Sequence, residues 1–237
     1  MKIPVVILCG GMGTRLSGID TTKPLINIGE LPIIVHIMNY YAKQGYTRFH
    51  LCMGYNSDRL VDYFRHTTIP WDVQLWDTGA DTGTMGRLAK IEKHLPNRRF
   101  FLTYCDVIHD TPLNEFVRFH DHHRRLVTAL GVKQEIPYGV MSCNHEEVLF
   151  FNEKPPMPEH QYISGGMFLM ERDTLALLSP SRHNSLEEKL FPFLATQGHM
   201  RVYRHSGYWQ GMNTISDWHT LQDSYTRGES VWMYSKD

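Results

Sequence analysis

The chain lacks the cysteine pattern that would mark a disulfide framework or a zinc cluster. Its 237 residues include four widely separated cysteines and no Cys-x-x-Cys pair: Cys9, Cys52, Cys105 and Cys143. Three of them lie in or beside apolar segments typical of strands, where a free cysteine behaves as a small core residue. Neither a cysteine-based zinc site nor a disulfide-stabilised fold is therefore indicated.

An excess of charge of either sign is also missing. The 24 basic and 25 acidic residues give a formal net charge of −1 at pH 7. Composition therefore offers no electrostatic reason to expect nucleic acid or an anionic membrane as a partner. Any binding of phosphate must depend on local cations.

Long apolar runs and internal repeats are absent as well. The apolar run over residues 3–8 follows a single lysine and is too short for a signal peptide or a membrane span. We expect a soluble, cytoplasmic protein that forms one domain over residues 1–237.

Two familiar phosphate-binding loops are missing, but a different glycine-rich turn is present. The chain has neither Gly-x-Gly-x-x-Gly nor a Gly-Lys-Ser/Thr tail after its first strand-like run. It has Gly10, Gly11 and Gly13 directly after that run, which suggests close approach of the backbone to a ligand, most often phosphate. If the glycines were the only signal, a tight turn beside a solvated arginine would be enough to explain them. The Thr14-Arg15 pair and Lys23 favour the phosphate interpretation.

Strand-like and amphipathic segments alternate through the first half. We expect strands over residues 3–8, 48–53, 73–76 and 99–104, and helices over residues 33–45, 58–65 and 85–94. This order predicts an α/β fold with a doubly wound, mostly parallel, Rossmann-like sheet flanked by helices. Ligands of such sheets bind beyond the carboxyl ends of the strands, where the glycine turn and Asp106 fall.

From about residue 128 the alternation loosens. Residues 127–132, 139–142 and 148–151 are expected to form strands of a smaller, mixed sheet, followed by a strand over residues 162–170 that contains Gly165 and Gly166. A helix over residues 186–197, a strand over residues 200–204 and a closing helix over residues 216–227, begun by a Ser216 cap, complete the prediction.

With these elements in place, the chain resembles the sugar-1-phosphate nucleotidylyltransferases, and most of all their glucose-1-phosphate cytidylyltransferase branch. The signature Gly10-Gly-Met-Gly-Thr-Arg-Leu16 with Lys23-Pro24 carries the resemblance. Further matching stretches follow in the same order: Asp77-Thr-Gly79, Thr82-Gly-Thr-Met-Gly-Arg-Leu88, Thr103-Tyr-Cys-Asp106, Glu153-Lys-Pro155, Ser164-Gly-Gly166 and Gly207-Tyr-Trp-Gln-Gly-Met-Asn-Thr214.

The resemblance implies a defined reaction. A sugar 1-phosphate, with glucose 1-phosphate as the best candidate, attacks the α-phosphorus of CTP in line, giving a CDP-sugar and pyrophosphate, while Mg²⁺ neutralises phosphate charge. No general base is required, because the second pKa of a phosphate monoester is about 6. The resemblance also implies a homo-oligomer, a nucleotide-binding half over residues 1–127 and an acceptor-binding and closing half over residues 128–237.

Site residues follow from the matched motifs. The resemblance implies catalytic roles for Arg15, Lys23, Asp106 and Lys154, with Asp106 and Asn213 as metal ligands. It places the nucleotide against Leu8, Gly10, Gly11, Met12, Gly13, Thr14, Thr82, Arg87 and Cys105. The acceptor would contact Gly139, Glu153, Lys154, Gly166 and Trp209.

Some positions depart from the family pattern. Asn213 stands where the family has a second metal-binding carboxylate, and Asp217 could compensate from one helical turn away. Cys105 and Val107 replace glycines around Asp106, and the loop between Leu16 and Lys23 is shorter.

These departures leave alternatives open. The same chemistry could use another nucleoside triphosphate, or a non-sugar phosphate or phosphonate acceptor. A catalytically silent, nucleotide-binding relative is a further alternative, and Asn213 motivates it.

A cluster of histidines invites a metal interpretation. His120, His122 and His123 flank Asp121, but on a helix only His120 and His123 share a face. We expect a solvated or capping cluster and assign no metal to it.

Overall fold

The computed structural model describes residues 3–13, 21–95, 98–178 and 184–233, and their core is one seven-stranded sheet. The strand order is β12-β8-β11-β6-β1-β4-β5. In this sheet β11 alone runs antiparallel to its neighbours, and the other six strands are parallel to one another. The predicted doubly wound, mostly parallel α/β fold is confirmed.

The elements have the following bounds. The sheet is built from β1 (Val5–Cys9), β4 (Arg48–Met53), β5 (Asp72–Asp77), β6 (Arg99–Tyr104), β8 (Val127–Val132), β11 (Ile163–Glu171) and β12 (Met200–His205). Short pairs are formed by β2 (Asn27–Ile28) with β3 (Leu31–Pro32), β7 (Val107–His109) with β13 (Trp209–Gly211), and β9 (Val140–Asn144) with β10 (Glu147–Asn152). The helices are α1 (Ile33–Lys43), α2 (Ser57–His66), α3 (Thr84–Ile91), α4 (Leu113–His123), α5 (Phe191–Thr196) and α6 (Ile215–Thr226).

The central strand β1 shows why two layers of helices are needed. All five of its residues are buried, and alternate side chains enter different cores. Ile7 packs in the core that contains the apolar residues of α1, and Leu8 packs in the core that contains Leu88 of α3. A strand that is apolar on both faces can lie only in the middle of such a sandwich.

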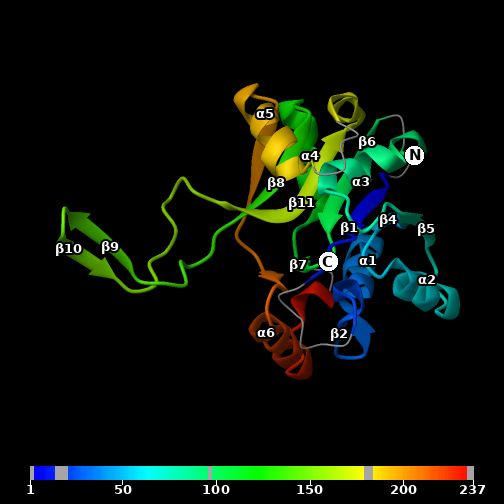
Figure 1. Ribbon diagram of the computed structural model, residues 1–237, viewed down its shortest axis with the longest axis horizontal. Helices are drawn as coiled ribbons and strands as arrows, with labels where there is room; N and C mark the ends of the chain where they lie inside the picture. The colour runs from blue at the N-terminus through cyan, green and yellow to red at the C-terminus, as the bar shows by residue number, and fades with distance from the viewer. Residues whose placement is uncertain (1–2, 14–20, 96–97, 179–183, 234–237) are drawn as a thin grey trace.

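The second half of the chain differs from the expectation of a smaller mixed sheet. Strands β8, β11 and β12 extend the main sheet, whereas β9 and β10 leave it as a separate antiparallel hairpin. We call residues 133–162 the arm; the hairpin forms its outer end, and Figure 1 shows the arm extending far from the rest of the molecule. The sequence pattern could not distinguish the two cases, because apolar residues signal a strand wherever it docks.

Two helix starts also differ from the expectation. The closing helix α6 is capped by Thr214, whose hydroxyl accepts from Asp217 N, so the predicted Ser216 cap is wrong and Ser216 lies in the first turn. The segment expected as one helix over 186–197 begins with a wider π-helical turn, Leu186–Leu190, before α5. Among the described residues, no helix is long and apolar enough to cross a bilayer.

Candidate functional site

A cavity of about 400 Å³ lies beyond the carboxyl ends of β1 and β6. It is lined by the glycine turn, the start of α3 and residues from four further segments: Leu8, Gly10, Gly11, Gly13, Lys23, Thr82, Gly83, Thr84, Arg87, Tyr104, Cys105, Asp106, Ser185 and Asn213. Its volume is in the range of small-ligand sites. The structure therefore gathers in one place most of the residues predicted to bind nucleotide and metal.

The glycine turn forms one wall of this cavity. Gly13 has a φ of +63°, a conformation that favours glycine, and a Cβ there would lie 3.1 Å from the Cβ of Lys23. Met12 is 66% exposed and is not among the lining residues. Thr14 and Arg15 lie outside the described residues, so their predicted roles stay predictions.

The Arg87 side chain fixes the glycine turn through a hydrogen bond to Gly10 O. Its side chain is buried, and its guanidinium donates to five protein oxygens on three segments: Gly10 O, Met53 O, Thr78 Oγ1, Gly79 O and Ala80 O. Burial lowers the pKa of Arg87 from its ordinary value. In this arrangement Arg87 ties the glycine turn to the end of β4 and to the loop after β5, and its predicted contact with nucleotide stays a prediction.

The charged centre of the cavity is formed by Lys23, Asp106 and Asn213. Lys23 Nζ donates to Asp106 Oδ2 at 2.6 Å and to Asn213 Oδ1 at 3.2 Å, and both charged side chains are largely buried. The two oxygens predicted to bind metal thus converge on one point. A carboxylate and an amide carbonyl are both ligands that Mg²⁺ accepts, usually completed by water and substrate phosphate. The donor set fits Mg²⁺.

Asn213 is positioned by the start of α6. Asp217 Oδ2 accepts from both Asn213 N and Thr214 N at 2.8 Å, which fixes the turn that carries the Asn213 side chain. Asp217 was expected to compensate for the missing metal-binding carboxylate, but it does not line the cavity, and its carboxylate holds the backbone at the start of α6. Its compensation at the metal stays a prediction.

Cys105 and Thr82 complete the nucleotide side of the cavity. The Cys105 side chain is buried, and burial raises the pKa of its thiol, so it is a packing residue at neutral pH. Thr82 Oγ1 donates to Thr78 O at 2.7 Å.

Gly166 and Trp209 lie on the other side of Asp106. Gly166 has a φ of +76°, and a Cβ there would lie 2.9 Å from Val107 Cγ2, so only glycine lets β11 approach this turn. Trp209 Nε1 donates to Gly165 O at 2.9 Å. Trp209 also lines a neighbouring cavity of about 480 Å³, together with Tyr162 and Arg204.

The remaining predicted acceptor residues lie on the arm. Gly139 directly precedes β9, and Glu153 and Lys154 directly follow β10, outside the cavity lining and, for the last two, exposed to solvent. The structure does not bring these three residues to Asp106, although a Cβ on Gly139 would lie 2.9 Å from Glu153 Oε2. Their roles in binding the acceptor stay predictions.

Thr84 and Ser185 are cavity residues that the sequence analysis missed. Thr84 Oγ1 accepts from Leu186 N at 2.8 Å and donates to Glu187 Oε2 at 2.6 Å, which closes one end of the cavity. Thr84 lies within a matched motif and could have been chosen from it. No sequence signal connects Ser185 to residues so far away.

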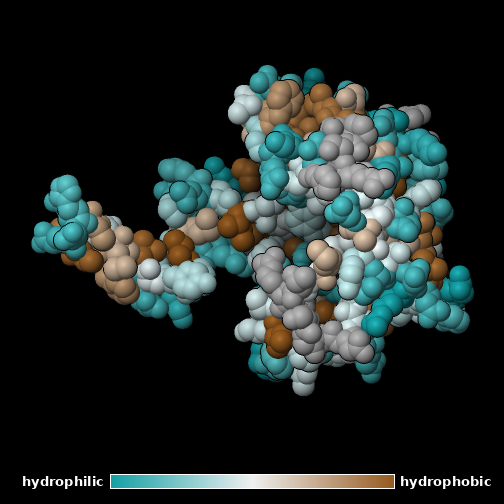
Figure 2. Space-filling model, in the orientation of Figure 1, coloured by the Kyte–Doolittle hydropathy of each residue, from teal (hydrophilic) through white to brown (hydrophobic). Residues whose placement is uncertain are grey.

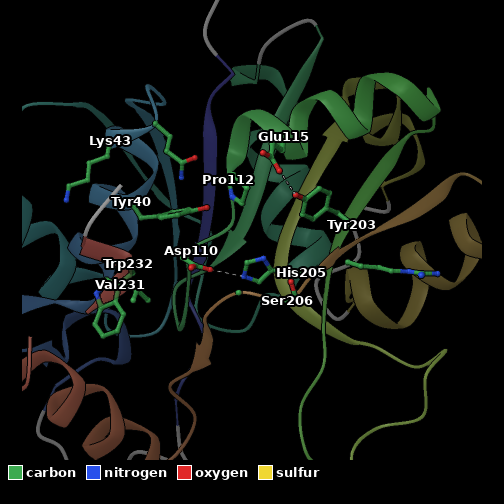
Figure 3. Close-up of a pocket in the computed structure, with 13 residues that line it drawn as sticks. Tyr40, Lys43, Asp110, Pro112, Glu115, Tyr203, His205, Ser206, Val231 and Trp232 are labelled. Atoms are coloured by element: carbon green, nitrogen blue, oxygen red, sulfur yellow. Dashed lines mark hydrogen bonds and ion pairs between the residues drawn. The ribbon is translucent and has the colours of Figure 1, made fainter. Parts of the chain in front are cut away.

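A third cavity, of about 350 Å³, opens between α1, the end of β12 and the turn Val231–Met233 (Figure 3). His205 Nε2 lies 3.0 Å from Asp110 Oδ1, and Tyr203 donates to Glu115 Oε2 at 3.3 Å. None of the predicted site residues lines this cavity.

Within the histidine cluster, His120 belongs to a buried polar network, whereas His122 is exposed to solvent. His120 Nδ1 lies 2.7 Å from Thr128 Oγ1, and its Nε2 lies 3.1 Å from Glu171 Oε1. Arg99 joins Glu171 and Asp121 at 3.3 and 2.6 Å. Burial lowers the pKa of His120 to about 4, so the ring is neutral at pH 7. The expectation of solvation was wrong for His120, because a single helix face does not reveal what strand will cover it.

The sequence matches the nucleotidyl transferase family over residues 4–228. The chain belongs to this family. It is 31% identical to glucose-1-phosphate cytidylyltransferase of Salmonella typhimurium over 96% of this chain and 97% of that protein. It is 30% identical to mannose-1-phosphate guanyltransferase beta-A of Xenopus laevis, over 91% of this chain and 62% of that protein.

Among solved structures, HddC from Yersinia pseudotuberculosis has the same fold, with a TM-score of 0.76 and 21% identity over 94% of this chain and 99% of that one. The family resemblance and the nucleotidyltransferase class predicted from the motifs are confirmed.

Proposed function

We propose that this nucleotidyltransferase couples CTP to a sugar 1-phosphate, with glucose 1-phosphate as the best candidate, and releases pyrophosphate. The observation that carries the proposal is the position of Lys23, within hydrogen-bond distance of Asp106 and Asn213 beside an amide-lined glycine turn. The 31% identity to a glucose-1-phosphate cytidylyltransferase over nearly the whole chain supports CTP and this acceptor.

The chemistry needs charge and position rather than a base. A phosphate oxygen of the acceptor forms a new bond to the α-phosphorus, the bond from that phosphorus to the bridging oxygen breaks, and the electron pair leaves with pyrophosphate. The attacking phosphate is already largely dianionic at neutral pH. The main obstacle is the approach of two anions, which fixed cations and dipoles lower.

Residues in and around the cavity would each take a part in this reaction. Amides of the glycine turn would hold the triphosphate, and the Lys23 ammonium would lie at the reacting phosphate. Asp106 and Asn213 would hold Mg²⁺, which when bound supplies Lewis-acid neutralisation of phosphate oxygens. Gly166 and Trp209 would form the acceptor side, and Arg15 would hold the leaving pyrophosphate. Glu153 and Lys154 lie on the arm, outside this cavity, so their part in binding the acceptor rests on the motif match alone.

Asp106→Asn tests the charged centre. It removes the negative charge at nearly constant shape, so we expect turnover with CTP and glucose 1-phosphate to fall by about 10²–10³-fold. Asp72→Asn is the matched control, because Asp72, at the start of β5, forms an exposed ion pair with Arg48 of β4, and its loss should leave turnover unchanged. Near-normal turnover in Asp106→Asn would place the metal elsewhere.

Pyrophosphate release with each of four nucleoside triphosphates and a panel of phosphate and phosphonate acceptors tests the substrates. We expect CTP with a sugar 1-phosphate to give the highest kcat/KM. A preference for GTP would instead align the chain with its guanylyltransferase relatives. Binding of CTP with Mg²⁺ but no release with any acceptor would support a silent nucleotide-binding protein.

A further inference from the structure

The cavity of about 480 Å³ beside Trp209 is lined by charge of one sign. Its fully charged side chains are Lys133 and Arg204, its aromatic side chains are Tyr162 and Trp209, and none of the described residues that line it is a carboxylate. A concave surface with charge of one sign concentrates ligands of the opposite sign. Figure 2 shows hydrophobic surface along the arm, so this basic cavity at the base of the arm is a separate feature.

The arrangement of three strands brings the two cations together. Lys133 directly follows β8, Tyr162 directly precedes β11, and Arg204 lies near the end of β12. In the sheet β8 lies between the other two strands, parallel to β12 and antiparallel to β11, so these three strand ends meet at one edge. Lys133 Nζ lies 5.2 Å from the centroid of the Tyr162 ring, and Arg204 Cζ lies 5.6 Å from it. Both distances are those of cation–π contacts.

Neither cation is neutralised by the protein. Lys133 Nζ donates to the uncharged carbonyl of Pro158 at 3.2 Å, and in the part of the chain that the structure describes neither Lys133 nor Arg204 forms an ion pair with a carboxylate. The Asp110 carboxylate, which lies 3.0 Å from His205 Nε2, lines the cavity of Figure 3 instead. Both cations are exposed, so a ligand can reach them. An anionic group in this cavity would meet two cations that no carboxylate offsets.

Trp209 forms a common wall between this cavity and the charged centre. A Cβ on Gly211 would lie 3.1 Å from Asn213 Nδ2 and 3.3 Å from Trp209 Cη2, so the indole ring and the Asn213 amide lie about one methyl group apart. The other end of the indole is fixed, because its Nε1 donates to Gly165 O at 2.9 Å. The basic cavity is therefore adjacent to the proposed metal site.

This adjacency indicates which end of the acceptor meets the basic cavity. In the proposed reaction the attacking phosphate lies at Asp106 and Asn213. The rest of the acceptor then extends past Trp209, and its far end lies beside Lys133 and Arg204. A guanidinium group pairs with phosphate or carboxylate through two parallel hydrogen bonds, and an ammonium group binds either as a point charge.

We propose that the acceptor is a sugar 1-phosphate that carries a second anionic group, and that Lys133 and Arg204 bind this group beside the Tyr162 ring. The inference rests on the proposed function, because the charged centre sets the position of the 1-phosphate. It adds the charge of the acceptor at its far end. Glucose 1-phosphate has no charge there and leaves both cations unmatched, so its anionic derivatives are the better substrates.

Acceptors that differ only at C6 test this inference. They are glucose 1-phosphate, glucuronic acid 1-phosphate and glucose 1,6-bisphosphate, and C6 is the exocyclic carbon of the sugar. Pyrophosphate release is measured with CTP, or with whichever triphosphate the enzyme prefers. We expect at least one anionic acceptor to exceed glucose 1-phosphate in kcat/KM by about tenfold or more, mainly through a lower KM, as one charge-assisted hydrogen bond allows. The better of the two identifies the group as carboxylate or phosphate.

Variants connect the preference to the cavity. Lys133→Gln and Arg204→Gln should each lower the ratio of kcat/KM between the preferred anionic acceptor and glucose 1-phosphate, and the double variant should bring this ratio to about one. Arg201→Gln is the matched control. Arg201 is exposed on the same strand, donates to Gly198 O and Met200 O, and does not line the cavity, so the wild-type ratio should persist.

The outcomes separate this inference from the proposed function. If glucose 1-phosphate equals or exceeds both anionic acceptors in kcat/KM, the second anion is wrong and the proposed function stands. A preference that persists in the double variant, or that falls equally in Arg201→Gln, would show that the cavity does not bind the anion. Absence of pyrophosphate release with every acceptor would overturn the proposed function, and this inference with it.

Discussion

At the scale of single residues, the cavity depends on side chains that each hold a neighbour in place. Lys23 lies between Asp106 and Asn213, and Arg87 fixes the glycine turn through Gly10 O. Such buried, hydrogen-bonded charges are costly to disturb, since removal of one partner leaves the other unpaired. Small changes here should therefore alter both binding and stability.

Asn213→Asp adds one carboxylate to the proposed metal site. If Asn213 faces the metal, the added charge should lower the Mg²⁺ concentration for half-maximal activity by roughly tenfold, because ligand charge tunes affinity for hard cations. A titration of activity with Mg²⁺ measures this. Unchanged Mg²⁺ dependence would remove residue 213 from the metal site.

Gly10→Ala and Gly11→Ala form a matched pair in one turn. A Cβ at Gly10 would overlap the Arg87 guanidinium, whereas a Cβ at Gly11 meets nothing within 4 Å. We expect Gly10→Ala to lower the free energy of unfolding by about 1–3 kcal/mol and to weaken CTP binding, with little change in stability for Gly11→Ala. Thermal unfolding and calorimetric titration with CTP compare them; equal stabilities would contradict the bracing role of Arg87.

At the scale of elements, strand ends and helix starts bring the site together. Asp106 follows β6, Lys23 begins a single helical turn, Lys23–Leu25, and Asn213 precedes α6. The sequence predicted the strand before Asp106 from its buried apolar run. It did not predict the Thr214 cap, because several hydroxyl residues lie near this helix start and only the geometry selects one.

Thr214→Ala tests this helix start. Loss of the capping hydroxyl should lower the free energy of unfolding by ~1 kcal/mol. Because the same turn carries Asn213, the Mg²⁺ requirement should also rise. Ser216→Ala, in the first turn of α6, is the control and should leave the metal requirement unchanged. Equal effects of the two variants would show that the cap does not position Asn213.

At the scale of the whole molecule, stability should depend on pH through buried histidine. Burial holds the pKa of His120 at about 4 in the folded protein, below the ordinary value of 6.5. The unfolded chain therefore binds more protons between these values, and the stability present above pH 6.5 is lost as pH falls toward 4. His120→Gln should flatten this decline in denaturant unfolding measured from pH 7 to pH 5, whereas exposed His122→Gln should not. An unchanged slope in His120→Gln would assign the dependence to other groups.

The sequence by itself determined the alternation of strands and helices along the first half of the chain, the glycine turn, and the place of Asp106 directly after a strand, because the pattern of apolar residues and the carboxyl-end rule are local signals. The family motifs added the other candidate residues. Only the tertiary structure decided that Lys23, Asp106 and Asn213 converge, that Arg87 braces the turn, and that the arm leaves the body. Lys23, for example, is separated in the sequence from Asp106 by 83 positions and from Asn213 by 190 positions. No local sequence pattern encodes the spatial distance between segments that only folding brings together.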